Sequence, residues 1–545
     1  MSSEKKGAGD PTERDHVERI ESHDDGNLKH VDAAADAAAK GQAISGYESL
    51  TPWETAKKFK RCVAVCFFAA FSAATDGFQI AINASIIANQ GFIQEFATKT
   101  NDEGERYLES PILSAWGSIM SVGQMLGMAT IPFLSTRFGR KAAMYTFWCI
   151  LALSVLTESL ARIWPVWLIG KLLAGIGVGC LQTTLPTYIA EVAPIRIRGS
   201  LLMCYSLWWT IGSFMGQVTL NQLAKTHPTK WLVPVYVQWA QIGIMIIIYV
   251  FLPESPAWCV TRGHLDRAKK ELQNLYGGVE DFNVDQQVEI ILLTVEHEKA
   301  VAAEQKRENW YSIFIGVDGF RTLVSVWTNL SQMFIGLTLF GSFGTYFFQQ
   351  AGIPNPFQVK VITSSINIAA VLGAVFLADR FGRRLLACVA TTVCLIACVA
   401  IGILGVVPRS DASNYIFVVF AVFWNIGLNC NGAAGWGFVG EISSQRLRHY
   451  TAGLGSSLIC IVAIAMNNLV PYMVNANEWN WGLKTAWFYV GVGFPFTVGM
   501  WFLIPETAGR SAAELDELFQ RKIKPWRFHK TETATQRLLK EEQEN

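Results

Sequence analysis

Ionisable and amide side chains inside long apolar runs are the residues of this chain that could do chemistry. Asp76 lies in the first such run. An acidic group there is a candidate proton carrier, because burying a lone charge costs on the order of several kcal/mol. Amides in later runs both donate and accept hydrogen bonds, as the hydroxyls of a polyhydroxy ligand require. These amides are Gln182, Asn425, Asn429, Asn467 and Asn468. Two alternatives stay open: Asp76 could cap its helix near an interface, and amides also join neighbouring helices.

The composition indicates that these runs lie in a membrane. Of 545 residues, 51% are hydrophobic and 16% are charged, against about 25% charged in soluble domains. The net charge is only +1, and the basic residues do not gather in one patch, which excludes nucleic-acid binding as the function. No disulfide framework, metal site or dinucleotide site is expected, and no cofactor is implied.

Twelve apolar runs of about 20 residues predict twelve transmembrane helices, so the expected fold class is an all-α membrane protein. The runs cover residues 62–88, 112–135, 142–161, 164–190, 201–223, 231–252, 322–349, 359–378, 385–407, 414–440, 451–474 and 483–504. Glycines recur in the second and fourth runs, where they predict close helix packing. They are Gly117, Gly123, Gly127, Gly170, Gly175, Gly177 and Gly179.

The breaks between the runs divide the chain into five regions. We expect a disordered tail over residues 1–60 without a signal peptide, a first six-helix bundle over 61–252 and a central loop over 253–320. Two surface helices, 265–276 and 288–308, are predicted in that loop. A second bundle over 321–505 and a tail over 506–545 complete the chain.

Basic loops set the expected orientation, and they repeat between the two halves. Arg137-Phe-Gly-Arg140-Lys141 returns as Arg380-Phe-Gly-Arg383-Arg384, and Glu191 with Arg198 returns as Glu441 with Arg448. All of these loops fall on one side, which the positive-inside rule makes cytoplasmic, together with both termini. Duplicated halves of this kind are the architecture of a transporter whose site lies between them at the midplane.

Several motifs resemble those of the sugar porter family within the major facilitator superfamily, over nearly all of residues 60–530. They are Asp379-Arg-Phe-Gly-Arg-Arg384, Pro186-Thr-Tyr-Ile-Ala-Glu191 with Arg198-Gly199, Pro253-Glu-Ser-Pro256 and Pro505-Glu-Thr-Ala-Gly-Arg510. Val439-Gly-Glu-Ile-Ser-Ser444, Tyr346-Phe-Phe-Gln-Gln-Ala-Gly352 and Trp479-Asn-Trp-Gly482 are most similar to the fungal maltose and general alpha-glucoside proton symporters. The resemblance implies two six-helix bundles that move a sugar by alternating access.

The resemblance also places sugar-contact positions along the chain. Gln332, Asn367 and Trp436 match family positions and supply amides and one aromatic plane for a sugar. Thr338 and Ser206 stand where relatives have asparagine and glutamine. Because amides are lost at these and other matched positions, we expect a less polar pocket. The full set of expected substrate contacts is Gln332, Asn367, Trp436, Thr338, Gln79, Gln182, Ser206 and Asn467.

Proton coupling is the main departure from the family pattern. The family's proton-coupling aspartate falls on Gln79, which cannot titrate, and Lys171 replaces an arginine of the fourth helix. Asp76 lies one helical turn from Gln79, so a pair of Asp76 with Lys171 is the expected substitute. If Asp76 is inert, a passive uniporter is the better interpretation.

A cytoplasmic gate is expected from the basic loops, where arginines pair with glutamates and hold that side closed. Its residues are Arg137, Arg140, Glu191, Arg198, Asp379, Arg380, Arg383, Glu441 and Arg448. The alternative is that the basic residues only fix topology.

The function expected is uptake of a sugar with a proton across the cell membrane, by a monomeric carrier that is not an enzyme. Two other possibilities stay open. One is a non-transporting sugar sensor, and the other is a carrier of a less polar metabolite or polyol.

Overall fold

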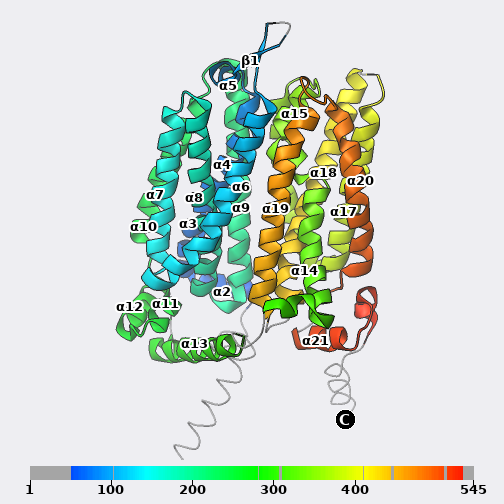
Figure 1. Cartoon of the computed structure of the whole chain (residues 1–545). Helices are drawn as coiled ribbons and strands as arrows, with labels where there is room; N and C mark the ends of the chain where they lie inside the picture. The colour runs from blue at the N-terminus through cyan, green and yellow to red at the C-terminus, as the bar shows by residue number, and fades with distance from the viewer. Residues whose placement is uncertain are drawn as a thin grey trace, which may run out of the picture.

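The computed structural model describes residues 51–101, 104–279, 282–305, 310–408, 410–443, 447–507 and 512–531. Within these ranges, the side chains of residues 374–381, 433–437, 439–441 and 448–449, with a few others, are not described. The described chain is almost entirely helical, and its long helices run side by side through the molecule (Figure 1).

The first half of the chain forms one bundle. Its first span is split into α3 and α4, because the helix is interrupted at Phe71, and it ends in a short 3₁₀ turn, η1. The elements are α3 (Lys60–Ala70), α4 (Ser72–Ser85), η1 (Ile86–Ala88), α6 (Ser110–Phe138), α7 (Arg140–Leu160), α8 (Trp164–Val192), α9 (Ile195–Thr226) and α10 (Val233–Phe251).

The second half forms the other bundle, and its first span is broken in the middle. The elements are α14 (Gly316–Phe334), η3 (Leu337–Ser342), α15 (Gly344–Gln350), α16 (Pro356–Phe381), α17 (Arg383–Leu404), α18 (Asp411–Ile442), α19 (Arg448–Val474), η5 (Gly482–Lys484) and α20 (Thr485–Leu503). The two bundles stand next to each other, with α6 beside α19 (Figure 1). Helix α9 also contacts α16.

Nine helices in the described ranges are long and apolar enough to cross a membrane. The other three predicted spans correspond to α9, α14 and α16, which fall outside that set of nine. All three line the cavity described below with polar side chains. The protein is therefore a multi-pass membrane protein, and for these three helices the membrane crossing stays a prediction.

Shorter elements distinguish the two ends of the molecule (Figure 1). One end, here named the hairpin end, carries α5 (Gln90–Phe96), the antiparallel strands β1 (Lys99–Thr100) and β2 (Arg106–Tyr107), and α15. The opposite, tail end carries α2 (Pro52–Lys58), α11 (Pro256–Thr261), α12 (Leu265–Tyr276), α13 (Val284–Gln305), η2 (Trp310–Phe314), α21 (Ala512–Gln520) and η6 (Pro525–Lys530). Both ends of the described chain and the central loop thus lie together.

The tail-end helices test two local predictions. α12 coincides with the predicted helix 265–276, whereas α13 begins four residues before the predicted 288. Residues 52–58 form α2 inside the region predicted to be a disordered tail, because Thr51 and Glu54 close a capping box at its first turn. Residues 1–50 of that predicted tail lie outside the described residues.

The predicted continuous helix 322–349 is wrong. Gly336 adopts a left-handed conformation with φ 104°, and the chain continues as the single wide π-turn η3 before α15 begins. A break frees backbone carbonyls, which must find other donors in a membrane protein. Trp424 Nε1 donates to the Ile335 carbonyl at 2.8 Å, and Lys360 Nζ donates to the Phe340 carbonyl at 2.5 Å.

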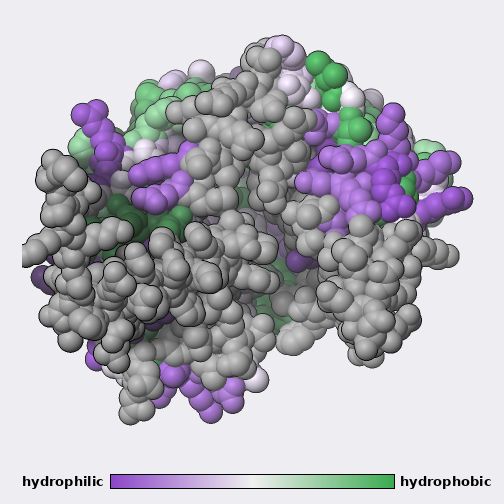
Figure 2. All heavy atoms as spheres, turned by 90° about the horizontal axis from the view of Figure 1, so that it is seen from below, coloured by the Kyte–Doolittle hydropathy of each residue, from purple (hydrophilic) through white to green (hydrophobic). Residues whose placement is uncertain are grey.

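Hydrophobic packing differs between the two ends. At the hairpin end, a single buried cluster joins both halves and includes Phe92, Trp116 and Trp231 from the first and Phe340 and Phe348 from the second. At the tail end the first half has its own cluster and the second half another. Among the described residues, the halves therefore share a core only at the hairpin end. Viewed from the tail end, hydrophilic side chains gather at the outside, with hydrophobic ones recessed between them (Figure 2).

Glycines bring α6 and α8 into close contact, as the sequence predicts. A Cβ atom at Gly175 would lie 2.3 Å from the Met120 carbonyl oxygen, and one at Gly127 would lie 2.3 Å from the Ile176 carbonyl oxygen. Gly123 and Gly179 meet the opposite backbone in the same way. These contacts fix the spacing of two helices that both line the central cavity.

Replacing Gly175 with alanine should therefore destabilise the protein by about 1–3 kcal/mol, because the new methyl group overlaps the α6 backbone. Gly243→Ala in α10 is the matched control, since a Cβ there meets nothing within 4 Å. That control should be neutral or gain about 0.5–1 kcal/mol. Thermal unfolding in detergent measures both, and equal unfolding temperatures would contradict the packing role.

Candidate functional site

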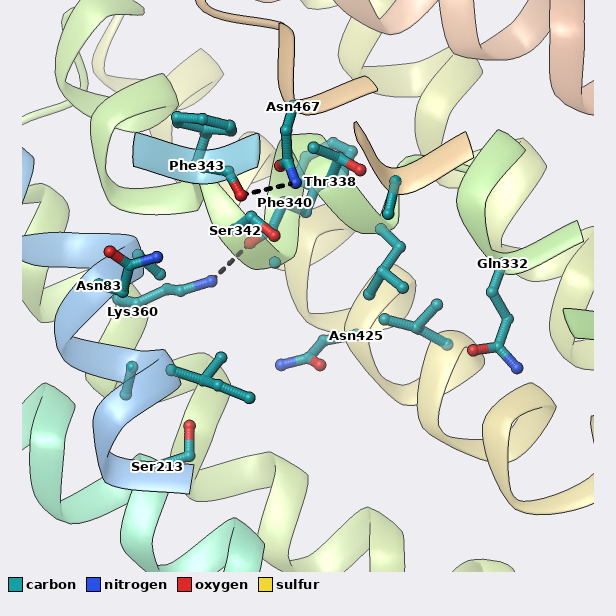
Figure 3. Close-up of a pocket in the computed structure, with 18 of the residues that line it drawn as sticks. Asn83, Ser213, Gln332, Thr338, Phe340, Ser342, Phe343, Lys360, Asn425 and Asn467 are labelled. Carbon is teal, nitrogen blue, oxygen red and sulfur yellow. Dashed lines mark hydrogen bonds between the residues drawn. The ribbon is translucent and has the colours of Figure 1, made fainter. Parts of the chain in front are cut away.

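A cavity of about 480 Å³ lies between the two halves and takes lining residues from both. α4, α6, α8 and α9 contribute from the first half, and α14, η3, α15, α16, α18 and α19 contribute from the second. Its volume falls within the range of about 300–1,000 Å³ that is usual for small-molecule sites. The close-up in Figure 3 shows labelled residues from both halves around the same space.

Amide side chains dominate the polar lining of the cavity. Ten lie among the described lining residues, and they are Asn83, Gln124, Gln182, Gln217, Asn329, Gln332, Asn367, Asn425, Asn429 and Asn467. The expectation of a pocket less polar than those of relatives stays a prediction. Amides absent from the matched positions are replaced by others, such as Asn329 and Gln217, that the motif comparison did not consider.

The structure brings five of the eight predicted substrate contacts to the cavity, namely Gln182, Gln332, Thr338, Asn367 and Asn467. Two are elsewhere. Gln79 is buried and donates to Glu158 Oε1 at 2.7 Å, while Ser206 is exposed on α9 away from the cavity. The side chain of Trp436 lies outside the described residues.

Several of these amides carry buried atoms that make no hydrogen bond to the described protein. They are Asn329 Nδ2 and Oδ1, Gln332 Nε2, Asn367 Oδ1 and Asn467 Oδ1. All four residues belong to the second half and line the cavity. Unpaired donors and acceptors of this kind cost free energy unless a ligand or water binds them, so they mark where a hydroxylated ligand can attach.

Aromatic rings supply flat apolar surfaces beside the amides. Trp116 and Trp209 line the cavity from the first half, and Phe340, Phe343 and Trp424 line it from the second. Trp424 is held by its hydrogen bond to the Ile335 carbonyl, and its ring lies 4.5 Å from that of Phe340 between centroids. The sequence interpretation assigned this role to Trp436 and missed Trp209, although the pair Trp208-Trp209 inside an apolar run was a visible signal.

A fully buried ion pair lies beside the cavity in the first half. Lys171 Nζ is 3.1 Å from Glu158 Oε1, and both side chains are 0% exposed. Gln79 and Ser154 also donate to Glu158 Oε1, and Lys171 lies over the Trp167 ring at 4.5 Å. Glu158 thus places a carboxylate next to Gln79, where the resemblance led us to expect an aspartate. It was missed, although it is a lone acid inside the third apolar run.

The predicted pair of Asp76 with Lys171 is therefore wrong, because Lys171 is paired with Glu158. Asp76 Oδ2 instead accepts from Gln182 Nε2 at 3.0 Å and from the Tyr205 hydroxyl at 3.4 Å. Its Oδ1 atom has no partner among the described residues. Asp76 does not cap a helix either, since it lies inside α4 and no side chain caps that helix. Through Gln182, this carboxyl is connected to the cavity wall.

A second set of charges organises the tail end of the first half. The Arg140 guanidinium binds Glu191, with its closest contact at 2.7 Å, and Ser255 Oγ donates to the same carboxylate at 2.6 Å. Glu254 accepts from the backbone N–H groups of Arg140 and Lys141, the first turn of α7. A carboxylate at a helix N-terminus is stabilised by the unpaired N–H groups there.

The second half repeats this arrangement. Glu506 accepts from the backbone N–H groups of Arg383 and Arg384 at the start of α17, as Glu254 does at α7. The preceding glycines, Gly139 and Gly382, have φ of 107° and 84°, and a Cβ on either would lie within 2.5 Å of the capping carboxylate. The repeated loop motif therefore needs glycine at this position for two reasons. The sequence interpretation recognised the motif and missed its glutamate partners.

The predicted gate is only partly described. Arg140 and Glu191 pair, but they lie in the same half, so this contact does not join the two halves in the present conformation. Arg137 is exposed, and Arg198 Nε is buried without a hydrogen-bond partner in the described part of the chain. The side chains of Asp379, Arg380, Glu441 and Arg448 lie outside the described residues.

Two helical bundles in a membrane, with an amide-lined cavity between them and repeated charged turns at one end, define a carrier of the major facilitator type. Comparison with known proteins agrees with this class. Residues 65–519 match the family described as "Sugar (and other) transporter". The chain belongs to this family.

Individual relatives give the same picture. The general alpha-glucoside permease of Saccharomyces cerevisiae is 26% identical, over 92% of this chain and 82% of the permease. The MFS transporter fmqE of Aspergillus fumigatus is 29% identical, over 92% and 96%. The solved inward open conformation of the xylose transporter XylE from E. coli superposes with a TM-score of 0.68 at 19% identity, covering 84% of this chain and 99% of that one.

The buried pair gives a direct test of the site's electrostatics. Glu158→Gln or Lys171→Met alone should destabilise the protein by about 3–5 kcal/mol, because each leaves one buried charge uncompensated. The double variant removes both charges and should lose much less than the sum of the two single losses. Thermal unfolding in detergent provides the measurement. Additive losses would show that the two side chains do not interact.

Proposed function

We propose that this protein carries a sugar, an alpha-glucoside, disaccharide or hexose, by exposing the central cavity alternately to the two sides of the membrane. The observation that supports this most strongly is the cavity itself, where ten amides and several aromatic rings from both halves surround one space. A sugar presents hydroxyl groups around its edge and an apolar face, so it needs both kinds of side chain. Family membership and the alpha-glucoside permease relative support the same substrate class.

Closure at one end supports alternating access. Hydrogen bonds cross between the halves at the hairpin end, where Asn468 Nδ2 donates to Ser118 Oγ at 2.8 Å and Asn475 Nδ2 donates to Ser110 Oγ at 2.9 Å. Ser85 and Thr345 also join across the halves, 2.6 Å apart. With the shared hydrophobic cluster, these contacts close the cavity toward the hairpin end. In the opposite state they must separate.

We further propose that the tail end faces the cytoplasm of the cell, with the protein in the plasma membrane. The tail end carries several basic residues in or next to α2, namely Lys57, Lys58, Lys60 and Arg61. The basic turns after α6 and α16 also lie at the tail end. Basic residues in short loops are retained on the cytoplasmic side. The conformation described here would then be closed to the outside, and uptake would be the physiological direction. The carrier is proposed to work as a monomer and without covalent chemistry.

Asp76 is the proposed proton-coupling group. Glu158 is neutralised by Lys171, whereas no cation is paired with Asp76 in the described structure. Its unpaired Oδ1 atom is available to hold a proton, and Gln182 joins the opposite oxygen to the cavity wall. Protonation of Asp76 then changes its hydrogen bond with Gln182 and so the orientation of the Gln182 amide in the cavity. Such a change links proton binding to substrate binding, as symport requires.

A cysteine pair at the hairpin end tests alternating access. In Ser118→Cys/Asn468→Cys, oxidation should form a disulfide between α6 and α19, because the native side chains are in hydrogen-bond contact. Uptake of labelled sugar into vesicles should then fall to background and return on reduction, while either single variant should be insensitive to oxidant. Full uptake by the cross-linked protein would exclude separation of the halves at this end.

Replacing Asp76 with asparagine tests proton coupling. The amide keeps the shape and the contact with Gln182 but cannot titrate, so proton-driven accumulation should fall to simple equilibration. Sugar counterflow, which needs no proton gradient, should persist and serves as the control for folding and binding. Accumulation at the wild-type level with an imposed proton gradient would exclude Asp76 and favour another group. If the wild-type protein only equalises the sugar concentration across the membrane, it is a facilitator and not a symporter.

The same assay addresses the other interpretations of the sequence. Accumulation or counterflow of any labelled sugar excludes a sensor that does not transport. A carrier of a less polar metabolite or polyol is the other open interpretation, and the name of the relative MFS transporter fmqE states no cargo. The unpaired amide atoms of Asn329, Gln332, Asn367 and Asn467 argue against such a cargo, because a ligand without hydroxyls would leave them without a partner.

A further inference from the structure

Lys360 is a cation in the wall of the cavity that the proposed transport cycle does not use. It lies one turn inside α16, lines the cavity and is half-buried. Figure 3 shows its side chain beside Asn83 of α4, extending toward Ser342 of η3. The amine donates to the Phe340 carbonyl at 2.5 Å, which accounts for one of its three protons.

No negative charge compensates Lys360 in the described structure. None of the described residues that line the cavity is aspartate or glutamate, and Lys360 forms no ion pair with a described carboxylate. Asp76 reaches the cavity only indirectly, through Gln182. The buried pair in the first half shows how this chain handles a lysine that needs a counter-charge, since Lys171 has Glu158 at 3.1 Å. The lining of the cavity is thus formally cationic.

We propose that the cavity is built for a sugar acid, a polyhydroxy compound whose carboxylate binds Lys360. This inference rests on the proposed function and specifies its substrate class. A substrate carboxylate supplies the missing counter-charge, and the amides hold the hydroxyl groups. A neutral sugar leaves the lysine without a counter-ion, at the usual cost of an unpaired charge in a partly dry site.

The layout of α16 fits a ligand with a charged end and a hydroxylated body. Lys360, Thr363, Ser364 and Asn367 all line the cavity, at the spacing of one helix face. Asn367 follows Lys360 by seven positions, which is about 10 Å along the helix axis. The unpaired amide atoms of the cavity are Asn367 Oδ1 at the far end of this face, together with atoms of Asn329 and Gln332 on α14 and of Asn467 on α19. The carboxylate therefore belongs at the Lys360 end and the hydroxyls toward Asn367.

The bond from Lys360 to Phe340 has a structural role as well, because η3 needs a donor for that carbonyl. A neutral amide could supply this donor without placing a charge in the cavity. Lys360→Gln therefore separates the two roles, since it retains a hydrogen-bond donor and removes the charge. Lys360→Arg retains both the charge and the donor.

The experiment compares ligands that differ only in the charged group. Purified protein in detergent is titrated with gluconate and its uncharged counterpart glucitol, and with maltobionate and maltitol, by calorimetry. The wild type should bind each acid more tightly than its alcohol by about 10- to 100-fold, the range of a charge-assisted hydrogen bond. Lys360→Gln should abolish this preference, and Lys360→Arg should retain much of it.

Ser364→Ala, on the same face of α16, is the matched control and should change both members of a pair alike. Size-exclusion profiles establish that each variant is folded. Equal affinity of the wild type for acid and alcohol would overturn the inference even if a variant failed to fold, as would a preference that survives Lys360→Gln. In either case, binding of glucose or maltose would leave the proposed sugar transport standing. If no sugar and none of the four probes binds, the proposed function itself is wrong.

Discussion

A charge removed from water must find compensation nearby, and the interior of this protein is arranged around that constraint. In the first half, the fully buried side chains of Glu158 and Lys171 compensate each other's charge at a distance of 3.1 Å between Oε1 and Nζ. This pairing releases Asp76 from the need to serve as a structural counter-ion. Among the described side chains, Asp76 and Lys360 form no ion pair, and each is connected to the central cavity. Both proposals made above for these residues, proton coupling and binding of a carboxylate, depend on this lack of an ionic partner.

The same constraint applies to the backbone, and it explains the details of the broken seventh span. Gly336 ends α14 and releases carbonyls that the helix would otherwise bind. Trp424 from α18 and Lys360 from α16 supply the donors, so two side chains of the cavity wall are fixed by the break itself. The Trp424 ring and the Lys360 amine are thereby held in place before a ligand arrives, which lowers the ordering cost of binding.

Much of the architecture could be predicted from the sequence because it depends on local patterns. Apolar runs, basic loops and the repeated Arg-Phe-Gly-Arg turn gave the two bundles and their common orientation, and glycine spacing gave the contact between α6 and α8. The site was predicted less well. The partner of Lys171 lies thirteen residues away across a turn, on another helix, and only the fold shows that it is Glu158 and not Asp76. Lys360 and Trp209 were overlooked because their importance comes from the cavity they face. The break at Gly336 was missed because the run 322–349, which also contains Gly341 and Gly344, was interpreted as one continuous helix.

The contacts between the two halves at the hairpin end, here called the seam, affect how easily the protein changes between its two conformations. Serine and asparagine side chains make the contacts across it, and these groups bond water about as well as they bond each other. Parting them exchanges one set of hydrogen bonds for another at little enthalpic cost. The apolar side chains of the shared hydrophobic cluster gain no such bonds from water. The area that they expose when the halves separate therefore sets the free-energy barrier to the conformational change. Hydration of the serine and asparagine side chains can thus begin the separation of the two halves, while the hydrophobic cluster determines how often the separation is completed.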